Sequence, residues 1–141
     1  MKKAHVRIVL CAQTLWVLVF AASCAGVPLE SEIPDLSVSA LLQEAQNSYD
    51  KNNVPAAQVY YRAILNRFPG DPPSVITAEY ELAHIKVKQK KWAEALPMID
   101  AALAKFDSDS ANTLPRAYYK LLLLDREKIP ERFRQGEVQG P

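Results

Sequence analysis

Cysteine is nearly missing from this sequence of 141 residues, and its two copies, Cys11 and Cys24, both precede residue 25. The rest of the chain therefore has no disulfide framework. Histidine is as scarce, with two copies, and only His84 lies beyond the N-terminal segment. A single histidine without cysteine partners does not make a metal site. We expect no metal, no cofactor and no catalytic residue, and we interpret the protein as a non-enzyme.

Glycine is also low, with 4 residues against 10 prolines. Few glycines argue against a β-sandwich with many tight turns and favour helices whose boundaries are marked by proline. An excess of charge is lacking too, since the formal net charge is +1. Nucleic-acid binders usually carry a clear basic excess, so the charge gives no reason to expect nucleic acid as a partner.

What is present begins with a segment, residues 1–23, that has the layout of an export signal. Lys2, Lys3 and Arg7 form a basic start, and an apolar run extends from Ile8 to Phe20 before three small residues. This run is shorter than the ~20 residues that a membrane-spanning helix needs. The segment is therefore predicted to be a signal peptide and not part of the fold.

The residues Ala21, Ala22, Ser23 and Cys24 resemble a bacterial lipobox, with Ala21 where leucine is typical. The resemblance implies that the Cys24 thiol is acylated, palmitate included, and becomes the mature N-terminus. It also implies an exported protein that is lipid-anchored to a bacterial membrane with its domain in the periplasm. The outer membrane is favoured because Ala25, not aspartate, follows the cysteine. Plain cleavage after Ala25 and an uncleaved anchor remain the alternatives. Residues 24–36 are expected to form the lipidated N-terminus and a tether.

The middle of the chain repeats itself at a spacing of 38 residues, as from Ser39 to Thr77. In this register small and large apolar residues recur in fixed alternation, and the matched pairs are Ala45 with Ala83, Val54 with Trp92, Ala57 with Ala95, Tyr61 with Ile99 and Phe68 with Phe106. Paired antiparallel helices need such a pattern, because alanine allows close approach of the backbones while a large residue fills the facing hole.

These residues resemble the tetratricopeptide repeat (TPR). The first copy has Ala45, Val54, Ala57, Tyr61 and Pro69 at the motif positions, and the second has Leu82, Ala83, Trp92, Ala95 and Ala102. Asn52 and Lys90 stand where the family usually has glycine, and Ile64 stands where a second alanine is usual. The resemblance implies an all-α fold over residues 37–130, with antiparallel helix pairs stacked as a short solenoid and a C-terminal capping helix. Residues 131–141 are expected to be a polar tail.

Local signals place the helix boundaries. Ser37 is a good N-cap, and Pro55 and the pair Pro72 and Pro73 fit the first turns of helices. Pro97 lies past the first turn of its helix, so it is expected to kink that helix or to move its start toward Ala93. A third helix, from about Leu114 to Lys128, is interpreted as the cap or as half of a third repeat. Its apolar run, residues 121–124, either packs on the second pair or forms a surface for another chain.

In the TPR family, ligands are held by the first helix of each repeat, on a concave face. The matching positions are predicted to form a partner-binding groove, and they are Leu42, Gln46, Tyr49, Asp50, Tyr80, His84, Val87, Lys88 and Tyr119, the last with its register uncertain by one. The alternative is that the tyrosines complete the core between helices, which is the reading we favour for Tyr61.

The sequence thus predicts a membrane-anchored adaptor that binds other envelope proteins or peptide segments through this groove. Three alternatives remain. The first is a structural subunit of an envelope assembly or transport complex that contacts partners through the capping helix. The second is a periplasmic small-ligand binder, and the most remote is an enzyme.

Overall fold

The computed structural model describes residues 26–135, and within them all regular structure is helical, with no strand. This confirms the all-α fold class. The elements are a 3-10 helix η1 (Glu30–Glu32) and the α-helices α2 (Val38–Asp50), α3 (Val54–Arg67), α4 (Pro72–Lys88), α5 (Trp92–Ser108), α6 (Arg116–Lys128) and α7 (Glu131–Arg134). None of the helices in this described range is long and apolar enough to cross a membrane.

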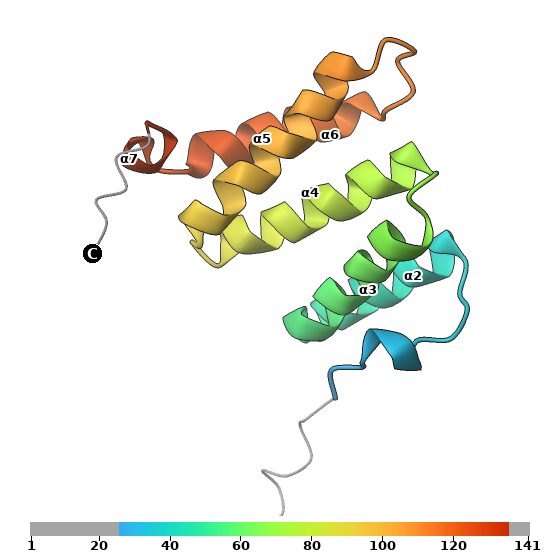
Figure 1. Cartoon of the computed structure of the whole chain (residues 1–141). Helices are drawn as coiled ribbons and strands as arrows, with labels where there is room; N and C mark the ends of the chain where they lie inside the picture. The colour runs from blue at the N-terminus through green and yellow to red at the C-terminus, as the bar shows by residue number, and fades with distance from the viewer. Residues whose placement is uncertain (1–25, 136–141) are drawn as a thin grey trace, which may run out of the picture.

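The helices stack as two antiparallel pairs with a cap (Figure 1). The first pair is α2 with α3, and the second is α4 with α5. Helix α3 packs against α4 and so joins the two pairs, while α6 covers both α4 and α5. The arrangement is the short repeat-like solenoid with a capping helix that the sequence predicts.

The small residues of the repeat lie where the helices nest. Ala45, Ala57, Ala83 and Ala95 each have an exposed fraction of 0%. A larger side chain at these positions would push the paired backbones apart, because helix interfaces are packed at the density of crystals. The central prediction from the sequence, that the recurring alanines face the interior, is confirmed.

The two turns inside the pairs are copies of each other. The amide of Asn53 donates to the carbonyl of Ser48 and that of Asn52 to Tyr49, and 38 residues later Lys91 donates to Lys86 and Lys90 to Val87. This is the Schellman pattern that ends many helices. It requires a left-handed residue, and Asn52 (φ 59°) and Lys90 (φ 57°) have that conformation. They are the two positions where the TPR family usually has glycine.

The predicted starts of α2, α3 and α4 are confirmed. Ser37 Oγ accepts a hydrogen bond from the amide of Ala40 at 3.3 Å, and Pro55 and Pro72 lie in the first turns of α3 and α4. Helix α5 begins at Trp92 and continues through Pro97. Proline has no amide hydrogen to offer the carbonyl of Ala93. Both residues are exposed, so water can bond that carbonyl instead.

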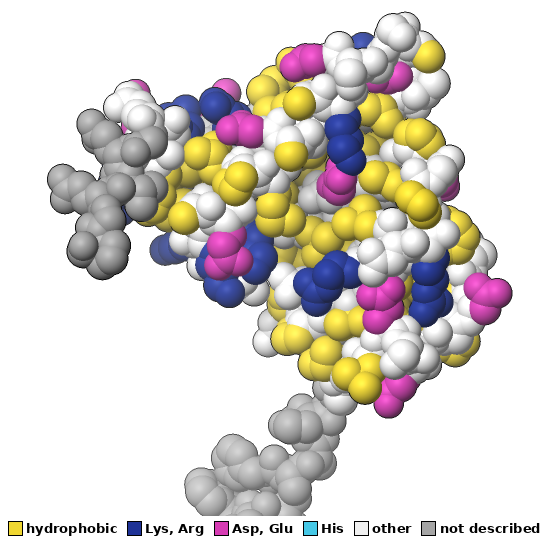
Figure 2. Space-filling model, in the orientation of Figure 1, with side chains coloured by type: hydrophobic (Ala, Val, Ile, Leu, Met, Phe, Trp, Pro, Cys, Tyr) yellow, Lys and Arg dark blue, Asp and Glu magenta, His cyan; other side chains and the backbone are white. Residues whose placement is uncertain are grey.

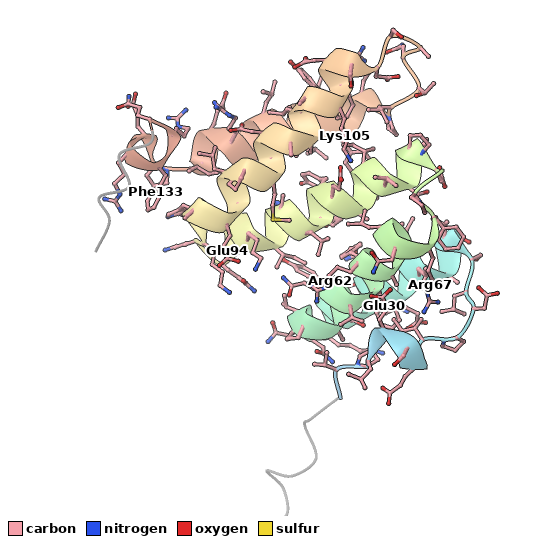
Figure 3. The ribbon with its side chains drawn as sticks, viewed as in Figure 1. Glu30, Arg62, Arg67, Glu94, Lys105 and Phe133 are labelled. Atoms are coloured by element: carbon pink, nitrogen blue, oxygen red, sulfur yellow. The ribbon has the colours of Figure 1, made fainter. Side chains whose placement is uncertain are left out.

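The expected tether is partly wrong, because residues 30–34 dock on α3. Ile33 is 6% exposed and belongs to the core. The Arg67 guanidinium donates to the carbonyls of Pro34 (2.7 Å), Glu30 (2.9 Å) and Ile33 (3.1 Å), and Figure 3 shows its place on α3 close to Glu30. One buried side chain and one arginine thus fix this part of the segment. The proposed signal peptide (1–23) and Cys24 lie outside the described residues.

The expected polar tail also needs correction at its start. Residues 131–134 form the short helix α7, which packs against α5. Phe133 is half-buried against the core cluster that contains Leu122 and Ile129. Figure 3 shows Phe133 on this last turn at the end of the stack. A single aromatic residue in a polar stretch supplies the apolar area that holds α7 in place.

Candidate functional site: the inner groove

A hollow of about 370 Å³ opens between the first helices of the pairs, α2 and α4, and the cap α6. We call it the inner groove. Its walls come from these three helices and its floor from α3, and it is lined by Ser39, Leu42, Gln43, Gln46, Tyr61, Thr77, Glu81 and Tyr118. Most of these side chains are polar, one carries a charge, and none is basic.

The groove is open because α2 and α4 have different neighbours. Helix α2 rests mainly on α3, whereas α4 is held by α3, α5 and α6. The four lining residues of α2 follow the spacing i, i+3, i+4 and i+7, so they share one face of that helix. Tyr61, 2% exposed, lies beneath them in the core, as the sequence predicts.

The predicted groove residues of the first repeat are in part where they were expected. Leu42 and Gln46 line the groove. Tyr49 is half-buried and packs against the first core cluster, outside the lining. Asp50 is exposed, and its carboxylate accepts a hydrogen bond of 2.9 Å from the side-chain amide of Gln46. Because a carboxylate only accepts, this bond leaves the carbonyl oxygen of Gln46 available.

The prediction is wrong for the second repeat. Tyr80 is 8% exposed and Val87 is 4% exposed, and both belong to the core cluster under α6. Lys88 is exposed but does not line the groove. The physical reason is that α6 lies on the face of α4 that would otherwise be concave surface. Burial raises the pKa of Tyr80 to about 12, and the nearby Asp125 carboxylate adds to the rise.

His84 faces α6. Its Nδ1 lies 2.6 Å from Oδ2 of Asp125, which is 2% exposed, and Lys128 Nζ donates to the other carboxylate oxygen at 2.7 Å. The imidazole also stacks on Tyr80, with ring centroids 5.5 Å apart. Asp125 is the one fully buried charged side chain in the described part of the chain, and both of its oxygens are paired. This network attaches the cap to α4.

The residue of α6 that lines the groove is Tyr118 and not the predicted Tyr119. The Tyr119 ring packs edge-on against Phe106 of α5, with ring centroids 5.5 Å apart. Tyr118 instead lines the groove, and its ring centroid lies 5.3 Å from that of Tyr80. Helix α6 is turned by one position relative to the predicted match. The buried Leu122, 0% exposed, fixes this rotation.

Sequence reasoning missed several lining residues, although a signal for them exists. Ser39 and Thr77 are separated by the repeat spacing of 38 residues, and so are Gln43 and Glu81. Both pairs of positions are therefore polar in both repeats and line the same groove. A search for repeated polar positions one or three residues away from the predicted Leu42 and Tyr80 would have found them.

Glu81 is the charged residue of the groove. Its side chain is half-buried and makes no hydrogen bond or ion pair with any residue in the range 26–135. Burial raises the pKa of the Glu81 carboxyl above its usual value, a rise that His84 opposes and Asp125 supports. Burial and the charge of Glu81 also raise the pKa of Tyr61. A carboxylate is thus held in a partly dry place without an ion pair to any residue in the range 26–135.

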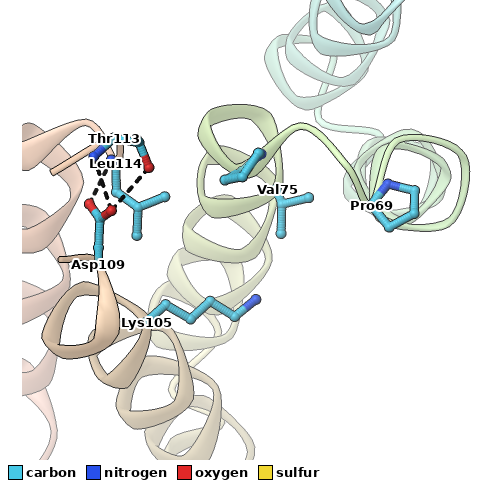
Figure 4. A pocket seen from close by; sticks show the side chains of 7 residues that line it. Pro69, Val75, Lys105, Asp109, Thr113 and Leu114 are labelled. Carbon is cyan, nitrogen blue, oxygen red and sulfur yellow. Dashed lines mark hydrogen bonds between the residues drawn. The ribbon is translucent and has the colours of Figure 1, made fainter. Parts of the chain in front are cut away.

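Two other hollows have their charges already paired. One, of about 300 Å³, lies beside the loop after α5 (Figure 4). There Asp109 accepts hydrogen bonds from the amides of Thr113 (3.0 Å) and Leu114 (2.8 Å), which lower the pKa of its carboxyl. Lys105 at its edge pairs with Glu79. The Asp109 bonds serve to shape the loop.

The second is a smaller hollow of about 220 Å³ between α3, α4 and α5. It lies on the face shown in Figure 2, where apolar side chains gather over the junction of the two pairs. Its one charged residue, Glu79, is held by Lys105. Oε2 of Glu79 has no hydrogen-bond partner in the described structure, but this atom is buried and a ligand in the hollow would not reach it. The inner groove is therefore the better candidate site.

The fold and groove define a small all-α stack of antiparallel helix pairs with a polar inner face. No group of three or more histidine, cysteine or acidic residues in the range 26–135 is placed to hold a metal ion. No protein-family model matches the chain, and no solved structure matches it.

The chain is similar to an uncharacterized protein of Treponema pallidum (strain Nichols), with 41% identity over 119 residues. The match covers 84% of this chain and 48% of that protein, so the chain spans about half of the relative's length. The similarity supplies no activity, because the relative is itself uncharacterized.

Proposed function

We propose that the protein is a lipid-anchored adaptor of a bacterial envelope that holds a polypeptide segment of another protein in the inner groove. The observation that carries the proposal is the hollow of about 370 Å³ whose walls come from α2, α4 and α6 and whose floor comes from α3. The groove is open along these helices and suits an extended segment better than an enclosed small molecule. Leu42 offers an apolar contact, and Ser39, Gln43, Gln46 and Thr77 offer polar atoms to the backbone of such a segment.

The N-terminal sequence supports the anchor. An export signal followed by Cys24 fits a lipoprotein, and two or three acyl chains bind a bilayer stably where one would not. An anchor of this kind raises the effective concentration of the groove near membrane proteins, so that a modest affinity suffices. We favour the outer membrane, with the domain in the periplasm.

The test is capture of partners after crosslinking in intact cells, with the groove filled by Gln43→Trp. Gln43 is exposed on α2, so the indole would occupy the hollow without entering the core. The matched control is Gln89→Trp, at an exposed residue after α4 that does not line the groove. We expect the wild type and the control to capture the same proteins and Gln43→Trp to lose them. Equal capture by all three would contradict the proposal.

The runner-up is a subunit that contacts partners through the cap. It is favoured by the exposed leucines of α6, of which Leu124 is 53% and Leu123 38% exposed. In that case Leu124→Lys would abolish the crosslinks and Gln43→Trp would leave them intact.

A further inference from the structure

We propose that the segment held in the inner groove presents an arginine side chain to Glu81. This inference rests on the groove function proposed above and names the chemistry of its guest. The inference starts from the charge of Glu81 and the acceptor atoms that line the groove beside it.

Three polar side chains of the groove use a donor within the chain. The amide nitrogen of Gln46 donates to Asp50 at 2.9 Å, and the hydroxyl of Thr77 donates to the carbonyl of Pro73 at 2.8 Å. The amide nitrogen of Gln43 is bonded to Asn47 at 3.0 Å. The carbonyl oxygens of Gln43 and Gln46, a lone pair of Thr77 and the carboxylate of Glu81 accept no hydrogen bond from another residue in the range 26–135, although each glutamine amide also keeps a second hydrogen. A guest with several donors can bond these acceptors.

The charge in the groove favours a cationic guest. Two other partly or fully buried carboxylates have cations, Asp125 with Lys128 and Glu79 with Lys105, and those of Glu30, Asp71 and Asp109 accept hydrogen bonds from Asn66, Ser74 and Thr113. Glu81 has none among residues 26–135, and the groove lining contains no lysine or arginine. His84, the nearest titratable base on α4, is bound to Asp125. An uncompensated carboxylate in a partly dry place costs free energy that a cationic guest would recover.

Among natural side chains the guanidinium fits best. It carries five donors in a planar fork and no acceptor, and it pairs with a carboxylate in bidentate geometry. Its flat face also packs on aromatic rings. Tyr61 and Tyr118 border the groove close to Glu81, and the Glu81 charge is near enough to Tyr61 to raise the pKa of that phenol. A lysine ammonium would meet the charge but fewer of the acceptors.

The experiment titrates the folded domain with N-acetyl-arginine amide and follows backbone amide signals by NMR. The matched probe is N-acetyl-citrulline amide, which has the same shape without the charge. We expect saturable shifts at Thr77, Glu81 and Tyr118 with the arginine probe and at least tenfold weaker binding of the citrulline probe. The variant Glu81→Gln should lower the arginine affinity to that of citrulline, while the control Glu127→Gln, which removes the same charge from an exposed site on α6, should leave it unchanged.

A carbon-detected titration of the Glu81 carboxyl gives an independent readout. Around it stand Tyr61 on α3, His84 on α4, and Tyr118 and Asp125 on α6, while the lining residues of α2 are uncharged. Bound arginine should return the pKa of Glu81 toward its usual value. Equal binding of both probes, indifference to Glu81→Gln, or no saturable shift in the groove would overturn the inference. The groove function itself is judged separately, by whether Gln43→Trp loses its crosslinked partners.

Discussion

The two helix pairs share one sequence pattern and one turn geometry, but their inner faces have different fates. At repeat-equivalent positions, Gln46 of the first pair lines an open groove, whereas His84 of the second is bound to Asp125 of the cap. In the same way Leu42 borders the groove, while its equivalent Tyr80 is 8% exposed in the core. The repeat pattern fixes which face of a helix points inward, and the number of neighbours in the stack fixes whether that face remains open.

The largest effect is expected from removing Leu122, the buried contact through which α6 covers the inner face of the second pair. Leu122 of α6 is 0% exposed, and Leu122→Ala should lower the free energy of unfolding by about 3 kcal/mol, since it leaves a cavity under the cap. Urea unfolding measures the loss. The matched control is Leu124→Ala, because Leu124 is 53% exposed, and it should change stability by less than about 0.5 kcal/mol. Similar losses in both variants would mean that α6 does not pack through Leu122.

The shared turn geometry predicts a gain of stability at equivalent positions. Lys90 has a φ of 57°, a conformation that costs a non-glycine residue about 1 kcal/mol or more. Lys90→Gly should therefore stabilise the protein by about 1 kcal/mol. Asn52→Gly should gain only a few tenths, since asparagine tolerates this region better. A shift of the urea midpoint to lower concentration in Lys90→Gly would contradict the left-handed turn.

The smallest expected effect is a pH dependence of stability that arises from Glu81 in the open groove. The pKa of Glu81 is raised in the fold above its ordinary value of 4.5. At a pH between the ordinary pKa and the raised pKa, the folded protein therefore binds more protons than the unfolded chain. Stability contributed by this group is therefore lost as pH rises through that window. Glu81→Gln should be slightly more stable than wild type at pH 7 and equal to it below the ordinary pKa.

Urea unfolding at two pH values measures this difference. Glu127→Gln serves as the control, because Glu127 is exposed and should show no such pH dependence. A Glu81→Gln variant that is less stable than wild type at pH 7 would mean that the carboxylate has a stabilising partner. A small gain would instead fit a residue kept for binding at a cost in stability.

Much of the fold could be predicted because its determinants are local or periodic. The buried alanines, the N-cap Ser37 and the proline-marked helix starts are all readable from neighbouring residues. The docking of Ile33 and Phe133 was missed, since each is one apolar residue in a polar segment and carries no periodicity. Of the predicted groove residues, Leu42 and Gln46 line the inner groove, whereas the other seven do not: Tyr49, Asp50, Tyr80, His84, Val87, Lys88 and Tyr119.

The sequence by itself determined the helices, their pairing and the spacing of the repeats, because small residues at a fixed period allow one way of nesting. The tertiary structure alone decided which inner residues stay accessible. That outcome depends on the rotation of α6, which Leu122 and the bond between His84 and Asp125 set from residues far apart in the chain. It left Glu81 beside a hollow without an ion pair among the described residues, an arrangement that arises from several helices meeting and from no single segment.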